Sequence, residues 1–276
     1  MERRRRVYPA ERHNSGWLSF FLLSASAIVL LSGWFLQDKG DGLTISPLNT
    51  RAPIPLNENF DETPAEREMT LPSSSWYALQ LGAFESETAA SELARQYMQR
   101  GAAGFVWHDG RYRTLAAVYP LKEDAQNVRR QLQENHAVES YLYQIDLPSI
   151  HIRLTGMEGQ LEILEAAFLH ANDLVAQLQS LSTAMDRQEI SREETLKKLL
   201  FLKEQMDLVA LRLQQRFASP RHETVTQMVE FLAGYETFCS ELSEQDSAVT
   251  LGTKLKHQTL ASLFQLKQVY DTLHHT

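Results

Sequence analysis

Residues 76–145 contain the same sequence unit twice, and this duplication constrains the fold more than any other feature of the chain. Tyr77 and Phe84 of the first copy recur, at one constant spacing, as Tyr112 and Tyr119 of the second. Each copy opens with alternating apolar residues, the pattern of a strand with one buried face. A helix-forming segment and a second short strand follow in each copy. The predicted order of elements is therefore β-α-β-β-α-β.

Two such units predict an α+β domain over residues 75–147. Its four strands form one sheet and both helices lie on the same face, the ferredoxin-like split βαβ arrangement. Alternation along the first strand puts Ala78 and Gln80 on the face that points away from the helices. That face is predicted to be free, and a binding site is expected there. Many unrelated domains share this architecture, so the residues themselves must indicate the function.

The first and third predicted strands carry the most specific motifs. Residues 76–84 read WYALQLGAF, and residues 111–113 read RYR. These motifs resemble the SPOR domain, the sporulation-related repeat that binds bacterial cell-wall peptidoglycan. The first strand of that family has a Q-x-G-x-F core, and its third strand begins with aromatic-x-R. Two departures stand out, because Ala83 replaces a common hydroxyl residue and Ala117-Val118 replaces the usual Gly-Pro.

The resemblance implies a site for peptidoglycan glycan strands without stem peptides, made by Gln80, Ala83, Arg111, Arg113 and Trp107. The amide of Gln80 offers a donor and an acceptor to sugar hydroxyl and N-acetyl groups. Arg113 matches a basic residue of the family and is suited to the lactyl carboxylate of muramic acid. Arg111 falls where the family often has a binding aromatic. Trp107 is either a stacking surface for a sugar or a core residue, and both interpretations stay open.

The N-terminal region predicts a membrane anchor. Residues 1–16 contain five arginines and form a basic tail that is expected to stay in the cytoplasm, and residues 17–36 are apolar without a charge. Twenty such residues match the roughly 30 Å hydrocarbon core of a bilayer, so a single-pass helix with the bulk of the chain outside the cytoplasm is expected. A cleavable signal peptide is the alternative. Residues 37–74 are rich in proline, lack apolar periodicity and are expected to be a disordered linker.

Composition and motifs exclude several classes of function. The net charge of −8 disfavours nucleic acid, whose binding proteins usually have a basic face. The single cysteine, Cys239, excludes a disulfide framework and a cysteine-rich zinc site and is expected to be a buried free thiol. The chain has no Glu-x-x-His pair, no Gly-x-Ser-x-Gly elbow and no glycine-rich phosphate loop. Spacing does not exclude a pair of carboxylates for glycoside cleavage, but no pair stands out among the many acidic residues. We therefore expect no enzyme activity, no metal and no cofactor.

After a possible extra edge strand at residues 146–155, the sequence becomes helical. Capping patterns at Thr155 and Ser191, each with glutamate three residues later, predict two helix starts, and Ser219-Pro220 predicts a third. Apolar stripes at helical spacing predict an antiparallel four-helix bundle over residues 155–274. The alternative is a pair of helical hairpins that is completed by dimerisation. The second stripe consists of Leu199, Leu202, Met206, Val209 and Leu213.

Two functional hypotheses follow from this organisation. In the first, a membrane-anchored protein binds peptidoglycan through its SPOR-like domain and acts in cell division, sporulation or wall remodelling at the septum. In the second, the protein is an envelope scaffold whose helical bundle recruits a partner protein, and the SPOR-like domain is structural only. The two hypotheses are compatible with each other.

Overall fold

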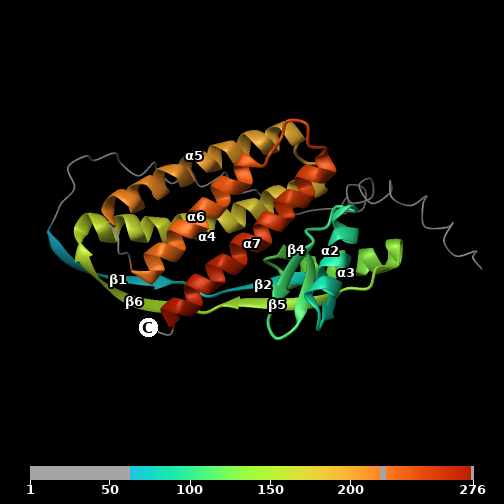
Figure 1. The fold of residues 1–276 in the computed structure, drawn as a ribbon, viewed down its shortest axis with the longest axis horizontal. Coiled ribbons are helices and arrows are strands. Elements are labelled where there is room, and N and C mark those ends of the chain that lie inside the picture. The colour runs from blue at the N-terminus through green and yellow to red at the C-terminus, as the bar shows by residue number, and fades with distance from the viewer. Residues whose placement is uncertain (1–62, 218–221, 275–276) are drawn as a thin grey trace, which may run out of the picture.

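The structure is a computed structural model, and it describes residues 63–217 and 222–274 (Figure 1). A small sheet with two short helices and a long helical bundle are joined by a two-stranded ribbon. The strands are β1 (Pro64–Leu71), β2 (Ser74–Phe84), β3 (Phe105–His108), β4 (Tyr112–Tyr119), β5 (Tyr141–Leu147) and β6 (Ile150–Met157). The helices are α2 (Glu87–Met98), α3 (Lys122–His136), α4 (Glu158–Asp186), α5 (Arg192–Arg216), α6 (Glu223–Ser240) and α7 (Ala248–His274).

The four-stranded sheet has the order β3-β4-β2-β5, and every pair of neighbours is antiparallel. This order confirms the predicted ferredoxin-like topology. Helices α2 and α3 both pack against β2 and β4. Their core contains Leu79, Tyr119 and Ala125, which come from both copies of the repeated unit. Thr114 fixes α2 on the sheet by donating a hydrogen bond to the carbonyl oxygen of Ala90 (2.9 Å).

Strand β1 corrects the prediction of a disordered linker over residues 37–74. It pairs with β6 from Pro64 opposite Met157 to Leu71 opposite Ile150, and these two antiparallel strands are the ribbon. A proline is tolerated here because it is the first residue of the strand, and Leu71 is buried. The rest of the predicted linker, residues 37–62, lies outside the described residues. The extra strand expected at residues 146–155 exists as β6, but it pairs with β1 instead of extending the four-stranded sheet.

The four long helices form the predicted bundle within one chain. Each helix packs on two neighbours, in the cycle α4, α5, α6, α7 and back to α4. All five residues of the second predicted stripe are buried, and the hydroxyl of Tyr235 donates to the carbonyl oxygen of Leu199 (3.0 Å). Cys239 is a buried free thiol, as expected, and burial raises the pKa of its thiol to about 11. This packing is that of a complete bundle, so the hairpin alternative is not what the structure shows.

Of the three predicted helix starts, the one at Ser191 is confirmed. The backbone N–H of Glu194 donates to Ser191 Oγ (3.2 Å), and the glutamate accepts from the Ser191 backbone (3.1 Å). The start predicted at Thr155 is wrong, because Thr155 belongs to β6 and α4 begins three residues later. Helix α6 begins at Glu223, after the predicted third start, and residues 219 and 220 lie outside the described residues.

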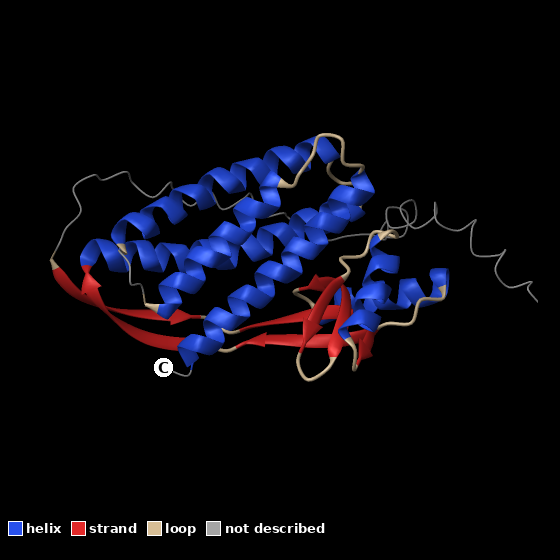
Figure 2. Ribbon diagram, in the orientation of Figure 1, coloured by secondary structure: helices blue, strands red, loops and turns tan. Residues whose placement is uncertain are grey.

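The bundle lies along one side of the strands (Figure 2). Helix α4 packs on β1 and β6, and α7 packs on β6 and on three strands of the four-stranded sheet. An ionic cluster holds β1 on α4, since the guanidinium of Arg67 contacts the carboxylates of Glu158, Glu162 and Glu165. The two-stranded ribbon and the four-stranded sheet therefore both lie against the same side of the bundle.

Candidate functional site

The sheet face that points away from α2 and α3 is mostly covered by α7, so the prediction of a free face is wrong. Phe264 of α7 stacks on Trp107, with ring centroids 4.0 Å apart, and on Phe105 at 5.4 Å. His257 Nδ1 donates to the carbonyl oxygen of Ala103 (3.0 Å). Trp76, Ala78, Leu115 and Ile145 of this face belong to the same apolar core as the bundle.

Of the two interpretations of Trp107, the structure supports the core residue. Its ring is engaged by Phe264, so it is a packing residue between the sheet and the bundle rather than an open surface for a sugar. An apolar face made by Phe105, Trp107 and Trp76 is costly to expose to water. That clustering is a signal in the sequence that something covers this part of the sheet, although the covering element cannot be identified from it.

Beyond the end of the α7 contact, the same face carries a polar cluster centred on Arg113. Its Nη1 donates to Gln80 Oε1 (2.8 Å), and its Nε donates to the carboxylate of Asp109 (2.8 Å). Its guanidinium carbon lies 4.9 Å from the ring centroid of Tyr143, whose hydroxyl donates to Asp109 (2.8 Å). The structure thus brings together Gln80 and Arg113, two of the five residues expected to bind.

The cross-strand register explains how these side chains meet. Gln80 lies opposite Leu115 on β4 and opposite Tyr141 on β5. Ala83 lies opposite Arg113, so both are on the same face. Arg113 also lies opposite Trp107 on β3, so the cluster begins where the packing of Trp107 under α7 ends. Arg111 is exposed just before β4 begins, and no contact of its side chain places it in the cluster.

The cluster is electrostatically paired. Partial burial by itself raises the pKa of the Asp109 carboxyl, but the hydrogen bonds from Arg113 and Tyr143 outweigh it, so the pKa lies below its usual value. Desolvation and the hydrogen bond to Asp109 raise the pKa of Tyr143. Asp109 is therefore ionised and Tyr143 neutral near neutral pH. The ionised Asp109 fixes the direction of the Arg113 guanidinium.

Asp109, Tyr141 and Tyr143 also belong to this region, although the sequence did not predict them as binding residues. Asp109 lies in the turn that joins the two repeats, where Gly110 has a φ of 95° that favours glycine. Tyr141 and Tyr143 alternate on β5, and Tyr141 is 59% exposed beside Gln80. Their alternation was readable as a strand, but the register that places them next to Gln80 depends on pairing between distant segments.

A comparison with known protein families identifies this part of the chain. Residues 73–144 match the family model of the SPOR domain. This segment is a SPOR domain. SPOR domains generally bind peptidoglycan and are linked to cell division. Searches of curated proteins and of solved structures gave no match. The SPOR match ends within β5, so β6 and the four-helix bundle lie outside the matched residues.

Other expected sites are limited by what the structure describes. Within residues 63–217 and 222–274, no helix is long and apolar enough to cross a bilayer. The expected span at residues 17–36 and the basic tail at residues 1–16 lie outside these ranges. In the same described part, no group of three or more His, Cys, Asp or Glu side chains is placed to hold a metal ion.

Proposed function

We propose that this protein binds the glycan strands of peptidoglycan through the uncovered end of its SPOR sheet. The observation that carries the proposal is the hydrogen bond between Arg113 and Gln80 on a partly exposed face of the domain. The two residues match the family's binding glutamine and basic residue. The proposal also draws on the domain's general association with peptidoglycan.

The chemistry of the cluster suits an amino sugar polymer. Arg113 occupies the oxygen of the Gln80 amide, which leaves the amide nitrogen to donate to a sugar hydroxyl or an N-acetyl oxygen. The Arg113 side chain is 23% exposed and offers its remaining N–H groups to a carboxylate. Tyr141 supplies an exposed aromatic ring at the edge of the same face. A sugar that packs on this ring would place its polar groups beside Gln80.

Because α7 covers much of this sheet face, it also limits the area that a glycan can contact. The sugar-binding surface would consist of the end of β2, the start of β4 and the start of β5, since the rest of the face is packed on the bundle. Ala83 and Arg111 would line this surface without being its main anchors. A short stretch of a glycan strand fits such a surface better than a long one.

We also propose that the chain is a non-enzymatic, single-pass membrane protein with its N-terminus in the cytoplasm. The support is the charge-free apolar stretch at residues 17–36, which follows the basic residues 1–16. The SPOR domain and the bundle would then lie outside the cytoplasm, where peptidoglycan is located. A role at the division septum follows from the general link of SPOR domains with cell division.

The second candidate function is a scaffold whose bundle binds a partner protein. The observation that favours it is the set of large apolar side chains that α5 exposes, Leu200, Phe201 and Leu211. The packing of α7 on the SPOR sheet also gives the sheet a structural role that does not need a glycan.

Binding of the full chain to purified peptidoglycan sacculi tests the proposal, with and without prior amidase treatment to remove stem peptides. We expect retention that increases after amidase and falls at least tenfold in Gln80→Ala and Arg113→Ala. Gln80→Glu is a sharper variant, because it keeps a partner for Arg113 and removes the amide donor; it should also lose binding.

Matched controls come from the other side of the domain. Arg95→Ala and Gln96→Ala change exposed residues of α2, which packs on the opposite face of the sheet, and should bind like the wild type. If wild type is not retained on either preparation, the glycan proposal is wrong and the scaffold proposal remains. Equal losses in the control variants would also contradict the assignment to Gln80 and Arg113.

A further inference from the structure

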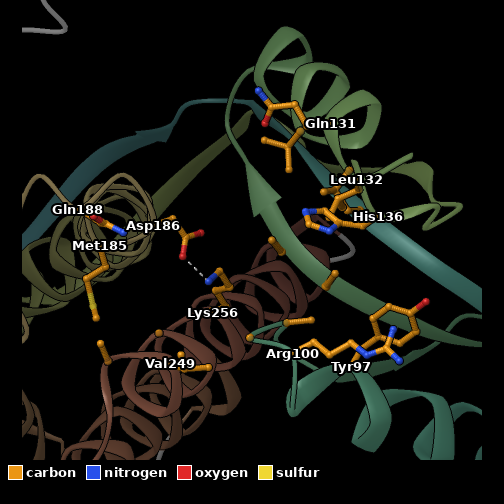
Figure 3. A pocket seen from close by; sticks show the side chains of 18 of the residues that line it. Tyr97, Arg100, Gln131, Leu132, His136, Met185, Asp186, Gln188, Val249 and Lys256 are labelled. Atoms are coloured by element: carbon orange, nitrogen blue, oxygen red, sulfur yellow. Dashed lines mark hydrogen bonds and ion pairs between the residues drawn. The ribbon is translucent and has the colours of Figure 1, made fainter. Parts of the chain in front are cut away.

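A second site lies on the helix-covered side of the SPOR sheet, away from the Arg113 cluster. A cavity of about 570 Å³ opens between the SPOR domain and the near end of the bundle (Figure 3). Tyr97 and Arg100 line it at the end of α2, and Leu132 and His136 line it from α3. Cavities of this volume hold small molecules.

The interior of the cavity is mainly apolar. Leu79, Ala116 and Ala117 of the sheet contribute to it, together with Leu132 of α3. The bundle contributes further apolar side chains, including Val249 in the first turn of α7. Small side chains at positions 116 and 117 keep this space open between the two helices of the SPOR domain. The departure of Ala117 from the usual family residue therefore falls on the cavity as well as on the strand.

The charged groups on the bundle side are already neutralised. Lys256 of α7 pairs with Asp186 at the end of α4 (2.6 Å). Glu189 pairs with Arg187 (3.8 Å), and Arg192 pairs with Glu193 (2.9 Å) while also donating to the backbone carbonyl groups of Glu244 and Asp246. This wall therefore adds little net charge to the cavity.

The SPOR side differs, because its cation has no acidic partner among the described residues. Arg100 is exposed, and its guanidinium carbon lies 5.2 Å from the ring centroid of Tyr97. His136 also lines the cavity, on α3, and adds a second basic side chain. An apolar cavity with an unpaired arginine at its edge is complementary to a molecule with an apolar body and one anionic group.

We propose that this cavity binds a free single-chain carboxylate of the fatty-acid type. The alkyl chain lies among the apolar side chains of the sheet, α3 and α7, and the carboxylate meets the guanidinium of Arg100. This site does not rest on glycan binding, since it lies on the opposite face of the sheet and shares no residue with the Arg113 cluster.

Photolabelling of the full chain in nanodiscs of zwitterionic lipid tests the proposal. The probe is a long-chain carboxylate with a diazirine in its chain, and labelled residues are mapped by peptide mass spectrometry. We expect labels on the segments that line the cavity, from α3 and from the start of α7. Dodecanoate should displace the probe, whereas dodecyltrimethylammonium, which has the same chain and the opposite charge, should not.

Two substitutions and one control complete the test. Val249→Trp fills the cavity from the half-buried first turn of α7 and should abolish cavity labelling, with folding checked by circular dichroism. Arg100→Gln should reduce it at least tenfold, and Arg95→Gln, which removes an exposed arginine of α2 outside the cavity, should not change it.

Labels confined to residues outside the cavity would overturn the proposal, as would undiminished cavity labelling in Val249→Trp. Equal displacement by the cationic competitor would overturn the assignment of a carboxylate. Displacement by an anionic double-chain phospholipid, which the zwitterionic nanodiscs lack, at the same concentration as dodecanoate would show that the source is the membrane rather than a free acid, contrary to the proposal.

Discussion

The packing of Phe264 on the SPOR sheet makes a strong prediction about stability. Its side chain is 2% exposed and stacks on Trp107 and Phe105 of β3. Phe264→Ala would remove this ring and leave a cavity between α7 and the sheet. The cavity cannot readily collapse, because pairing with β4 holds the backbone of β3 in place. We therefore expect a loss of about 4 kcal/mol in the free energy of unfolding, within the range of buried Phe→Ala changes.

A second substitution separates the contribution of aromatic stacking from that of apolar volume at position 264. Phe264→Leu keeps most of the apolar bulk and loses the two aromatic stacking contacts, each worth about 0.5–1.5 kcal/mol. We expect it to cost about 1–2 kcal/mol in the free energy of unfolding. Phe201→Ala is the matched control, because Phe201 is 45% exposed on α5, and it should cost roughly 0.5 kcal/mol or less.

Urea unfolding of the full chain measures these losses. The fluorine NMR signal of 5-fluorotryptophan at position 107, assigned with Trp107→Phe, reports on the local contact. In Phe264→Ala this signal should shift toward the position of an exposed tryptophan. A loss below about 1 kcal/mol with an unchanged signal would refute the reasoning, because a ring buried in this way cannot be removed at so small a cost.

Two smaller predictions concern charge and capping. The pKa of Asp109 is lowered in the folded state, so its contribution to stability is present above the pKa of the unfolded chain and is lost as pH falls through the folded value. The stability difference between wild type and Asp109→Asn should therefore shrink between about pH 5 and pH 3, and a pH-independent difference in urea titrations would contradict this. Ser191→Ala removes the side-chain cap of α5 and should cost about 1 kcal/mol in urea titrations. Ser86→Ala, at the start of α2 where no side-chain cap bond forms, should have almost no effect, and equal losses at the two positions would rule out capping as the cause.

Local patterns in the sequence were sufficient for the SPOR domain and the bundle. Alternation in two copies at a constant spacing predicted four strands and two helices in the correct order, because each strand needs only its own period to be recognised. The buried stripe from Leu199 to Leu213 was predicted in the same way. The Thr155 pattern misled because the same residue types occur in a strand, where Thr155 pairs with Glu66.

The errors arose where one distant segment determines the state of another. Strand β1 is recognisable only through its pairing with β6, since half of its eight side chains are polar and it begins with a proline. The cover of α7 on the sheet also depends on tertiary packing alone. For the site, Gln80 and Arg113 were identified by motif, but Asp109 and Tyr143 join them only through the fold.

The ribbon has a consequence for the order of events during biosynthesis. Its two strands are separated in the chain by the whole SPOR domain, so β1 is made early and has no partner until β6 has followed. The SPOR sheet can form in that interval, because its four strands lie between them. Pairing over such a sequence distance is slow compared with local contacts. We therefore expect the pairing of β1 with β6, and the packing of α4 on β1, to form late. Both would follow the folding of the SPOR domain that lies between the two strands in the chain.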